Sequence, residues 1–101
     1  MRPRGLAELD DLERVFKALS HGQRRQILVV LDARGGTMTA GEIADRFSCK
    51  WPTTSRHLRE LEQAGLVEVE RVGREWNYSL NRQRLERVAG RWLEAFGKGK
   101  D

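Results

Sequence analysis

The chain has 101 residues, 39% of them hydrophobic and 34% charged, a composition typical of one small globular domain. The 19 Lys and Arg against 15 Asp and Glu give a net charge of +4, which favours an anionic partner such as nucleic acid. No apolar run reaches the ~18–20 residues that span a bilayer, and the first residues lack the apolar stretch of a signal peptide. One cysteine cannot form an internal disulfide, so we expect a cytoplasmic protein. We expect a single domain over 1–101, with an ordered core at 6–96 and frayed ends at 1–5 and 97–101.

Two amphipathic helices are predicted first. Apolar residues from Leu9 to Leu19 recur at spacings of three and four, which predicts a helix over 6–19. Ser20 and Gln23 have the spacing of a capping box and predict the start of a second helix. The pair Gly35-Gly36 is expected to end that helix.

A second pair of helices is shorter. Thr39 and Glu42 predict another capping box, which opens a third helix to about residue 47. After a tight turn, Pro52 suits the first position of a fourth helix, because its missing N–H would have no partner there, and Gly65 ends that helix. Two short helices joined by a turn of about four residues are typical of a helix-turn-helix.

The hydrophobic period then changes from 3.6 to 2. Alternating runs at 67–70 and 76–80 flank Gly73-Arg74, which predicts a β-hairpin with a type II′ turn. A last helix is predicted over 82–96. The chain is therefore expected to be mainly α with a small β-hairpin wing, a winged helix-turn-helix in the order α-α-(short β)-α-α-β-β-α.

The exposed face of the fourth helix is the candidate nucleic-acid site. At about 100° per residue its apolar residues gather on one side, and Arg56 and Arg59 lie opposite. The interval 46–59 holds four basic residues and no acidic one. The candidate DNA contacts are Lys50, Trp51, Thr53, Thr54, Ser55, Arg56, His57 and Arg59, with Arg71 and Arg74 at the tip of the wing. The alternative is an ordinary solvated surface, since exposed helices are often rich in arginine.

These segments resemble the ArsR-type winged-helix transcriptional repressors. The resemblance covers roughly residues 9–96 and is carried by Phe16–Ser20, Arg24–Leu28, Gly41–Ala44, Pro52–Val67 and Arg71–Leu80. It implies a homodimer that binds a partly palindromic operator, represses transcription by occlusion, and dimerises through its first and last helices.

The terminal helices carry apolar faces of the kind that such a dimer needs. The candidate interface residues are Leu9, Leu12, Phe16, Leu85, Val88, Trp92 and Phe96. An exposed stripe of that size would be unusual on a monomer. The alternative is that both helices close the core of the monomer itself.

The chain departs from the family where many members hold metals. Thr39 and Gly41 stand where the resemblance expects a thiolate pair, and residues 82–96 contain no histidine, so we expect neither a metal site nor a cofactor. Cys49 lies in the turn before the fourth helix. It is either a small buried hydrophobe or a thiol activated by Lys50 and the nearby helix N-terminus.

The sequence predicts a double-stranded-DNA-binding transcriptional regulator, most simply a homodimeric repressor whose effector, if it has one, is unknown. A winged-helix module that binds protein without DNA, and a thiol-responsive regulator acting through Cys49, are the alternatives. The chain lacks a nucleophile–base set, a phosphate loop and a metal cluster, so we do not expect an enzyme.

Overall fold

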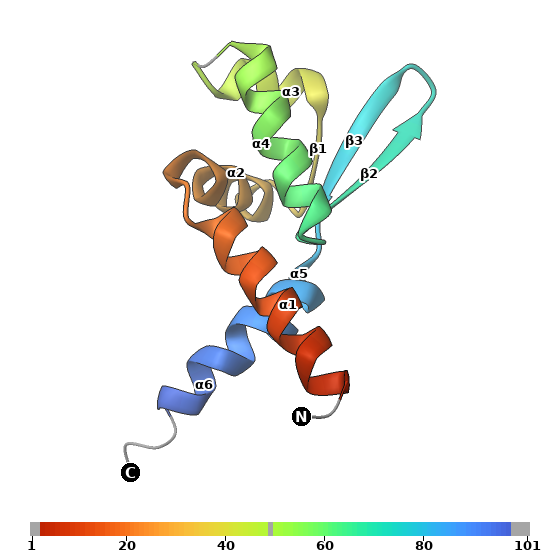
Figure 1. The fold of residues 1–101 in the computed structure, drawn as a ribbon. Helices are drawn as coiled ribbons and strands as arrows, with labels where there is room; N and C mark the ends of the chain where they lie inside the picture. Colours follow the sequence, from red (N-terminus) through yellow and green to blue (C-terminus); the bar gives the residue numbers. More distant parts are fainter. Residues whose placement is uncertain (1–2, 49, 98–101) are drawn as a thin grey trace.

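The computed structural model describes residues 3–48 and 50–97, with side chains from residue 8 onward. The elements follow in the order α1 (Pro3–Leu19), α2 (Gly22–Ala33), β1 (Thr37–Thr39), α3 (Ala40–Arg46), α4 (Trp51–Gln63), β2 (Val67–Val72), β3 (Glu75–Leu80), α5 (Arg82–Leu85), η1 (Glu86–Gly90) and α6 (Arg91–Gly97). Helices thus dominate, and the hairpin β2–β3 follows the pair α3–α4 as predicted. The hairpin extends beyond the helical body, and α1 crosses the last helix near η1, at the end of the molecule away from α3 (Figure 1).

The ends of the chain differ from expectation. Helix α1 begins at Pro3, within the tail expected at 1–5, and Gly97 still belongs to α6. The rest of the expected tails, 1–2 and 98–101, lies outside the described residues, as does Cys49.

Helix starts follow local hydrogen bonding. The Thr39 hydroxyl accepts from the Glu42 N–H at 3.1 Å and the Glu42 carboxylate accepts from the Thr39 N–H at 2.9 Å, which confirms the predicted capping box. The box expected at Ser20 is wrong, because the Ser20 hydroxyl donates to the Lys17 carbonyl at 2.6 Å. The N-cap of α2 is instead His21, which makes no side-chain capping hydrogen bond.

The fourth helix starts one residue earlier than expected. Lys50 is its N-cap and Trp51 its first residue, so Pro52 occupies the second position. The first N–H groups of a helix have no intrahelical partner, so proline costs no hydrogen bond there either. Gly65 follows the helix with φ +79°, a left-handed conformation that glycine adopts without strain.

The three strands form one antiparallel sheet in the order β1-β3-β2. In the hairpin, Val67 pairs with Leu80 and Val72 with Glu75, so the loop has two residues. Gly73 has φ +63°, and no non-glycine residue of the described chain has positive φ, which confirms the type II′ turn.

The core lies between α1, α2, α3, α4 and the inner end of the sheet. Its fully buried side chains include Val15, Ile27, Leu31, Ile43, Leu58, Leu61, Leu66 and Val67. Burying one such aliphatic side chain contributes about 1.5–3 kcal/mol. Helix α4 packs on α1 and α2 through this core, so its opposite face is held toward solvent.

The predicted last helix is interrupted. Residues Glu86–Gly90 form a π-helical segment between α5 and α6. Before it, the half-buried Arg84 donates from Nη2 to the Asp11 carboxylate at 3.1 Å and from Nε to the Ala64 carbonyl at 3.2 Å. A Cβ at Gly65 would lie 2.9 Å from Nε, so a larger residue there would displace the Arg84 side chain. One side chain thus joins α5, α1 and the end of α4.

Candidate nucleic-acid interface

The burial pattern of α4 divides the helix into a side that faces the core and a side that faces solvent. Thr54, Leu58 and Leu61 point into the core, and each is at most 2% exposed. The residues on the other side remain in solvent because nothing in the described chain packs over them. The exposed candidates are Lys50, Trp51, Thr53, Arg56, Arg59, Arg71 and Arg74, while Ser55 is half-buried.

Two of the predicted DNA contacts do not lie on this face. Thr54 is 2% exposed and His57 is 7% exposed, so both side chains belong to the interior. The register of α4 explains this, because residues 54, 57, 58 and 61 follow the spacing of three and four that lines one side of a helix. We therefore remove Thr54 and His57 from the candidate contact surface.

His57 has a particular environment. Its ring centroid lies 4.7 Å from that of His21, the N-cap of α2, and its Nδ1 is buried without a hydrogen-bond partner in the described chain. Burial lowers the pKa of His57, and its electrostatic interactions with His21, Arg24 and Arg56 lower it further. The imidazole is therefore neutral at physiological pH and joins α4 to the start of α2.

The cations on the exposed face have no acidic partner. Within the described residues, neither Lys50 nor Arg56 nor Arg59 forms an ion pair. An unpaired guanidinium keeps its five donors available for a guanine edge or a phosphate. The exposed side of α4 therefore carries a charge and a hydrogen-bonding capacity that suit nucleic acid.

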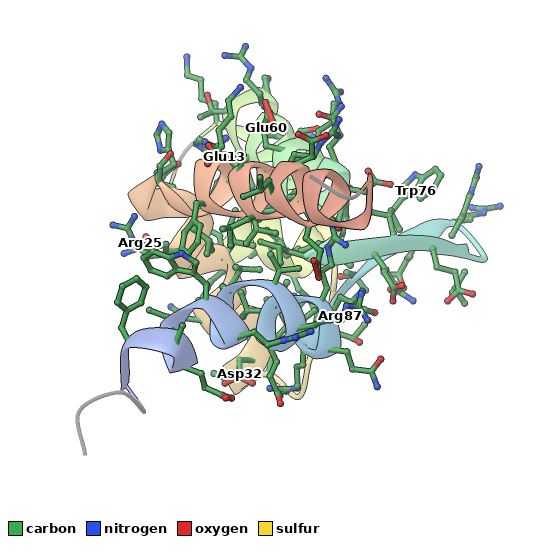
Figure 2. The ribbon with its side chains drawn as sticks, turned by 60° about the horizontal axis from the view of Figure 1, so that its bottom comes forward. Glu13, Arg25, Asp32, Glu60, Trp76 and Arg87 are labelled. Atoms are coloured by element: carbon green, nitrogen blue, oxygen red, sulfur yellow. The ribbon has the colours of Figure 1, made fainter. Side chains whose placement is uncertain are left out.

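The wing contains a residue that the sequence analysis did not select. Trp76 faces Arg71 across the hairpin, and the Arg71 guanidinium lies 5.6 Å from the centre of the indole ring. Trp76 is 47% exposed, and it lies on the hairpin beside the helical body (Figure 2). The alternation of β3 suggests that Trp76 points inward, but the tip of the hairpin extends past the core. The position of Trp76 in the sequence, close to the turn at Gly73, is the feature from which its exposure could have been predicted.

The candidate dimer residues fall into two groups. Leu9, Trp92 and Phe96 are exposed, at 47%, 42% and 57%. The others are half-buried, and Phe16, Leu85 and Val88 pack against the core of the same chain. The Phe16 and Trp92 rings meet edge to face at 5.1 Å, and Trp92 lies 4.7 Å from Phe96. Leu93, 59% exposed, extends the apolar face and is missing from the predicted set.

Neither a metal cluster nor a membrane-spanning helix is found among the described residues. The described residues contain no group of three or more His, Cys, Asp or Glu side chains placed to hold a metal ion. Where the resemblance predicts a thiolate pair, the Thr39 hydroxyl is used in the cap of α3 and Gly41 has no side chain. Among the described helices, none combines the length and the apolarity needed to cross a membrane.

Comparisons with known proteins agree with this geometry. Residues 19–70 match a family model described as a helix-turn-helix domain. The chain is 41% identical over 88 residues to the transcriptional repressor SdpR of Bacillus subtilis (strain 168), covering 87% of this chain and 96% of that protein. It is 32% identical over 85 residues to the arsenic resistance transcriptional regulator ArsR1 of Pseudomonas putida, covering 84% of this chain and 62% of that protein. These relatives are transcriptional regulators rather than enzymes.

Solved structures give the same result. An ArsR-like transcriptional regulator from Rhodococcus sp. RHA1 superposes with a TM-score of 0.75 at 34% identity, covering 90% of this chain and 83% of that one. The homodimeric winged helix-turn-helix DNA-binding domain from Mycobacterium bovis, solved by NMR, superposes with a TM-score of 0.74 at 32% identity, covering 94% and 87%.

Proposed function

This chain belongs to the ArsR-type family of winged helix-turn-helix transcriptional regulators, and we propose that it acts as a homodimeric repressor that inserts α4 into the major groove of operator DNA. Membership makes it a DNA-binding regulator of transcription. The proposal that α4 contacts DNA is supported chiefly by its exposed face, where Arg56 and Arg59 have no acidic partner in the described chain.

Each exposed side chain has a role suited to its chemistry. We assign Arg56 to a guanine edge, because a guanidinium binds O6 and N7 of guanine with two hydrogen bonds. Thr53 and Ser55 suit base edges or phosphates, and Lys50, at the N-terminus of α4, suits a phosphate. Arg71 and Arg74 suit the backbone beside the wing.

The dimer is supported by a groove between α1 and the last helix. The groove has a volume of about 500 Å³ and includes Leu9, Leu12, Val88 and Trp92 of the candidate interface. Acidic Glu8 and Asp11 line one side and basic Arg87 and Arg91 the other. In a two-fold interface each contact occurs twice, so a pair between Glu8 of one copy and Arg87 or Arg91 of the other would be formed twice. That the similar M. bovis domain is described as homodimeric supports a dimer as such.

A dimer of this kind places two copies of α4 in successive major grooves. The half-sites of the operator would then lie about one helical turn apart, roughly 34–36 Å. Occupation of such a site at a promoter would exclude the transcription machinery. Because the target is chromosomal DNA, we also infer a cytoplasmic location.

The test is a gel shift on DNA flanking the chain's own gene, repeated over a series of salt concentrations. The logarithm of the affinity should fall with the logarithm of salt by about 0.9 for each phosphate neutralised. Lys50→Ala should reduce that slope by about one unit. Lys17→Ala, an exposed lysine on α1, is the matched control and should leave the slope unchanged. Absence of binding to every promoter fragment at low salt would contradict the proposal.

A further inference from the structure

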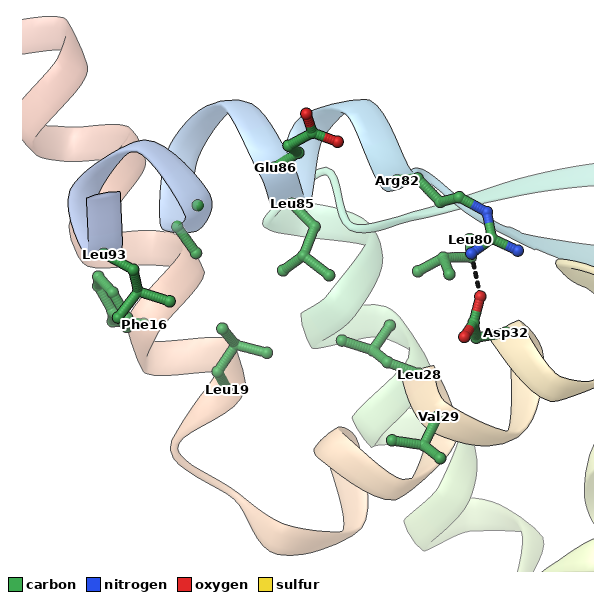
Figure 3. Close-up of a pocket in the computed structure, with 12 residues that line it drawn as sticks. Phe16, Leu19, Leu28, Val29, Asp32, Leu80, Arg82, Leu85, Glu86 and Leu93 are labelled. Carbon is green, nitrogen blue, oxygen red and sulfur yellow. Dashed lines mark hydrogen bonds and ion pairs between the residues drawn. The ribbon is translucent and has the colours of Figure 1, made fainter. Parts of the chain in front are cut away.

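One exposed tryptophan of the wing belongs neither to the core nor to the proposed dimer face. Other large exposed apolar side chains lie on α1, α2 and the last helix. They are Leu9, Trp92 and Phe96 of the candidate dimer face, and Val29 and Leu93 at a hollow between these helices (Figure 3). Trp76 lies on the hairpin instead, and its contact with Arg71 indicates what the ring does.

The alternation of the hairpin places Trp76 and Arg71 on the same face of the sheet. They pair with each other across β2 and β3, and the next pair on that face is Val69 with Tyr78. The side chains of Val69 and Tyr78 are half-buried and pack against the core. Arg71 and Trp76 therefore continue the inner face of the sheet beyond the edge of the core.

This inner face is turned toward α4. Burial raises the pKa of Tyr78, and Glu62 of α4 raises it further, whereas Arg59 of the same helix lowers it. The Tyr78 ring thus lies near the C-terminal half of α4, which packs against β2. Trp76 and Arg71 lie farther out on the same face, between Tyr78 and the tip of the wing. A DNA backbone that runs from α4 toward the wing would pass this pair.

Two contacts restrain the Arg71 side chain. Its Nε donates to the Gly73 carbonyl at 3.3 Å, and its guanidinium carbon lies 5.6 Å from the centre of the Trp76 ring. The hydrogen bond uses one of the five N–H donors, and the four on the Nη atoms have no partner in the described chain. A side chain that is already ordered loses less conformational entropy when it binds. The Nη groups of Arg71 are therefore both available and restrained.

We propose that Trp76 is a positioning residue, which orients the Arg71 guanidinium to bind a phosphate of the operator backbone beside the groove that α4 occupies. This inference rests on the proposed DNA-binding function. A cation–π contact at an exposed site corresponds to a factor of about two to five in an equilibrium constant. Arg74, in the turn of the same wing, has no such ring contact among the described residues and is the internal reference.

The test is a double-mutant cycle on the affinity for operator DNA, with Trp76→Leu, Arg71→Ala and the two together. Trp76→Leu keeps an apolar side chain but removes the ring, and it should weaken binding about twofold to fivefold. Arg71→Ala should weaken binding more and lower the salt slope by about one unit. Because Trp76 acts through Arg71, Trp76→Leu should cause no further loss in the Arg71→Ala variant. It should keep its full effect in the Arg74→Ala variant.

Conservative variants and a measurement without DNA separate positioning from a general effect on the fold. Trp76→Phe keeps an aromatic face and should retain most of the affinity. Val72→Ala is the matched control, because Val72 is an exposed residue on the opposite face of the hairpin, and it should leave the affinity unchanged. In the free protein, the NMR signal of the Arg71 Nε–H group should move in Trp76→Leu, where the ring is lost, and less in Trp76→Phe. Thermal unfolding should be the same for all of these variants.

Three results would overturn the proposal. The first is an unchanged operator affinity in Trp76→Leu, and the second is an equal loss in Trp76→Leu and Trp76→Phe. The third is a loss from Trp76→Leu that is as large without the Arg71 side chain as with it, since the ring would then contact DNA directly. Failure of the unsubstituted chain to bind any promoter fragment would instead contradict the proposed function, and the Arg71 signal would still report on the contact with Trp76.

Discussion

Arg56 offers the sharpest test of how α4 recognises DNA. The side chain is exposed, and within the described chain it forms no ion pair and no hydrogen bond. Its removal therefore costs the fold little, within about 0.5 kcal/mol for a surface site. A bidentate contact to guanine contributes about 1–3 kcal/mol of discrimination. Arg56→Ala should thus raise the dissociation constant for the operator by about 5- to 150-fold.

The matched variant separates charge from geometry. Arg56→Lys keeps the positive charge but loses the planar fork that makes two parallel hydrogen bonds. Both variants should lose discrimination at one base pair, and neither should lower the salt slope by the full unit expected for a lost phosphate contact, because Arg56 is assigned to a base. Fluorescence anisotropy on a labelled operator and on its single-base variants, at several salt concentrations, measures both effects.

Two results would refute this reasoning. An unchanged dissociation constant for Arg56→Ala would remove Arg56 from the contact surface. An equal loss on every sequence would show that Arg56 binds a phosphate rather than a base. Thermal unfolding of each variant, followed by circular dichroism, checks that the fold is intact.

Other predictions concern assembly, folding and pH. Trp92→Glu places a charge on the exposed apolar face and should convert dimers to monomers by light scattering; a persistent dimer would locate the interface elsewhere. Thr39→Ala removes the capping box of α3 and should cost about 1 kcal/mol and lower Tm by about 4–8 °C, whereas Thr53→Ala, an exposed threonine, should leave Tm unchanged. Because the pKa of His57 is lowered in the folded state, the unfolded chain binds the proton more readily. The free energy of unfolding should therefore fall as pH drops below about 6.5 toward the folded-state pKa, measured by urea denaturation. The variant His57→Gln should flatten that dependence, and an equally steep fall in it would contradict the assignment.

Much of the fold follows from local patterns. The Thr39 capping box, the Gly65 stop and the Gly73 turn are set by neighbouring residues, so the sequence alone predicts them. The box at Ser20 failed because the end of α1 lies within reach and its free carbonyl accepts the serine hydroxyl. An unpaired helix end competes for the same side chain, and spacing alone does not rank the two outcomes.

The candidate site was predictable as a face but not residue by residue. Helical angles place Arg56 and Arg59 outward, as the structure has them. The same angles put Thr54 on the apolar side with Leu58 and Leu61, so its burial was predictable. His57 lies nearer the edge of that side, and its burial also depends on how α2 and its N-cap His21 pack against α4. The π-helical segment is equally invisible, because the apolar stripe of the last helix continues through it.

Arg84 connects the helices proposed for dimerisation with the helix proposed for DNA recognition. Its guanidinium holds the carbonyl at the end of α4 and the carboxylate of Asp11 on α1, and its backbone belongs to the last helix. A dimer built on the terminal helices would therefore set the angle of each α4 through one half-buried side chain. The distance between operator half-sites would then be set by contacts inside the protein. Substitutions on the exposed face of α4 could therefore change which bases are recognised without changing the half-site spacing.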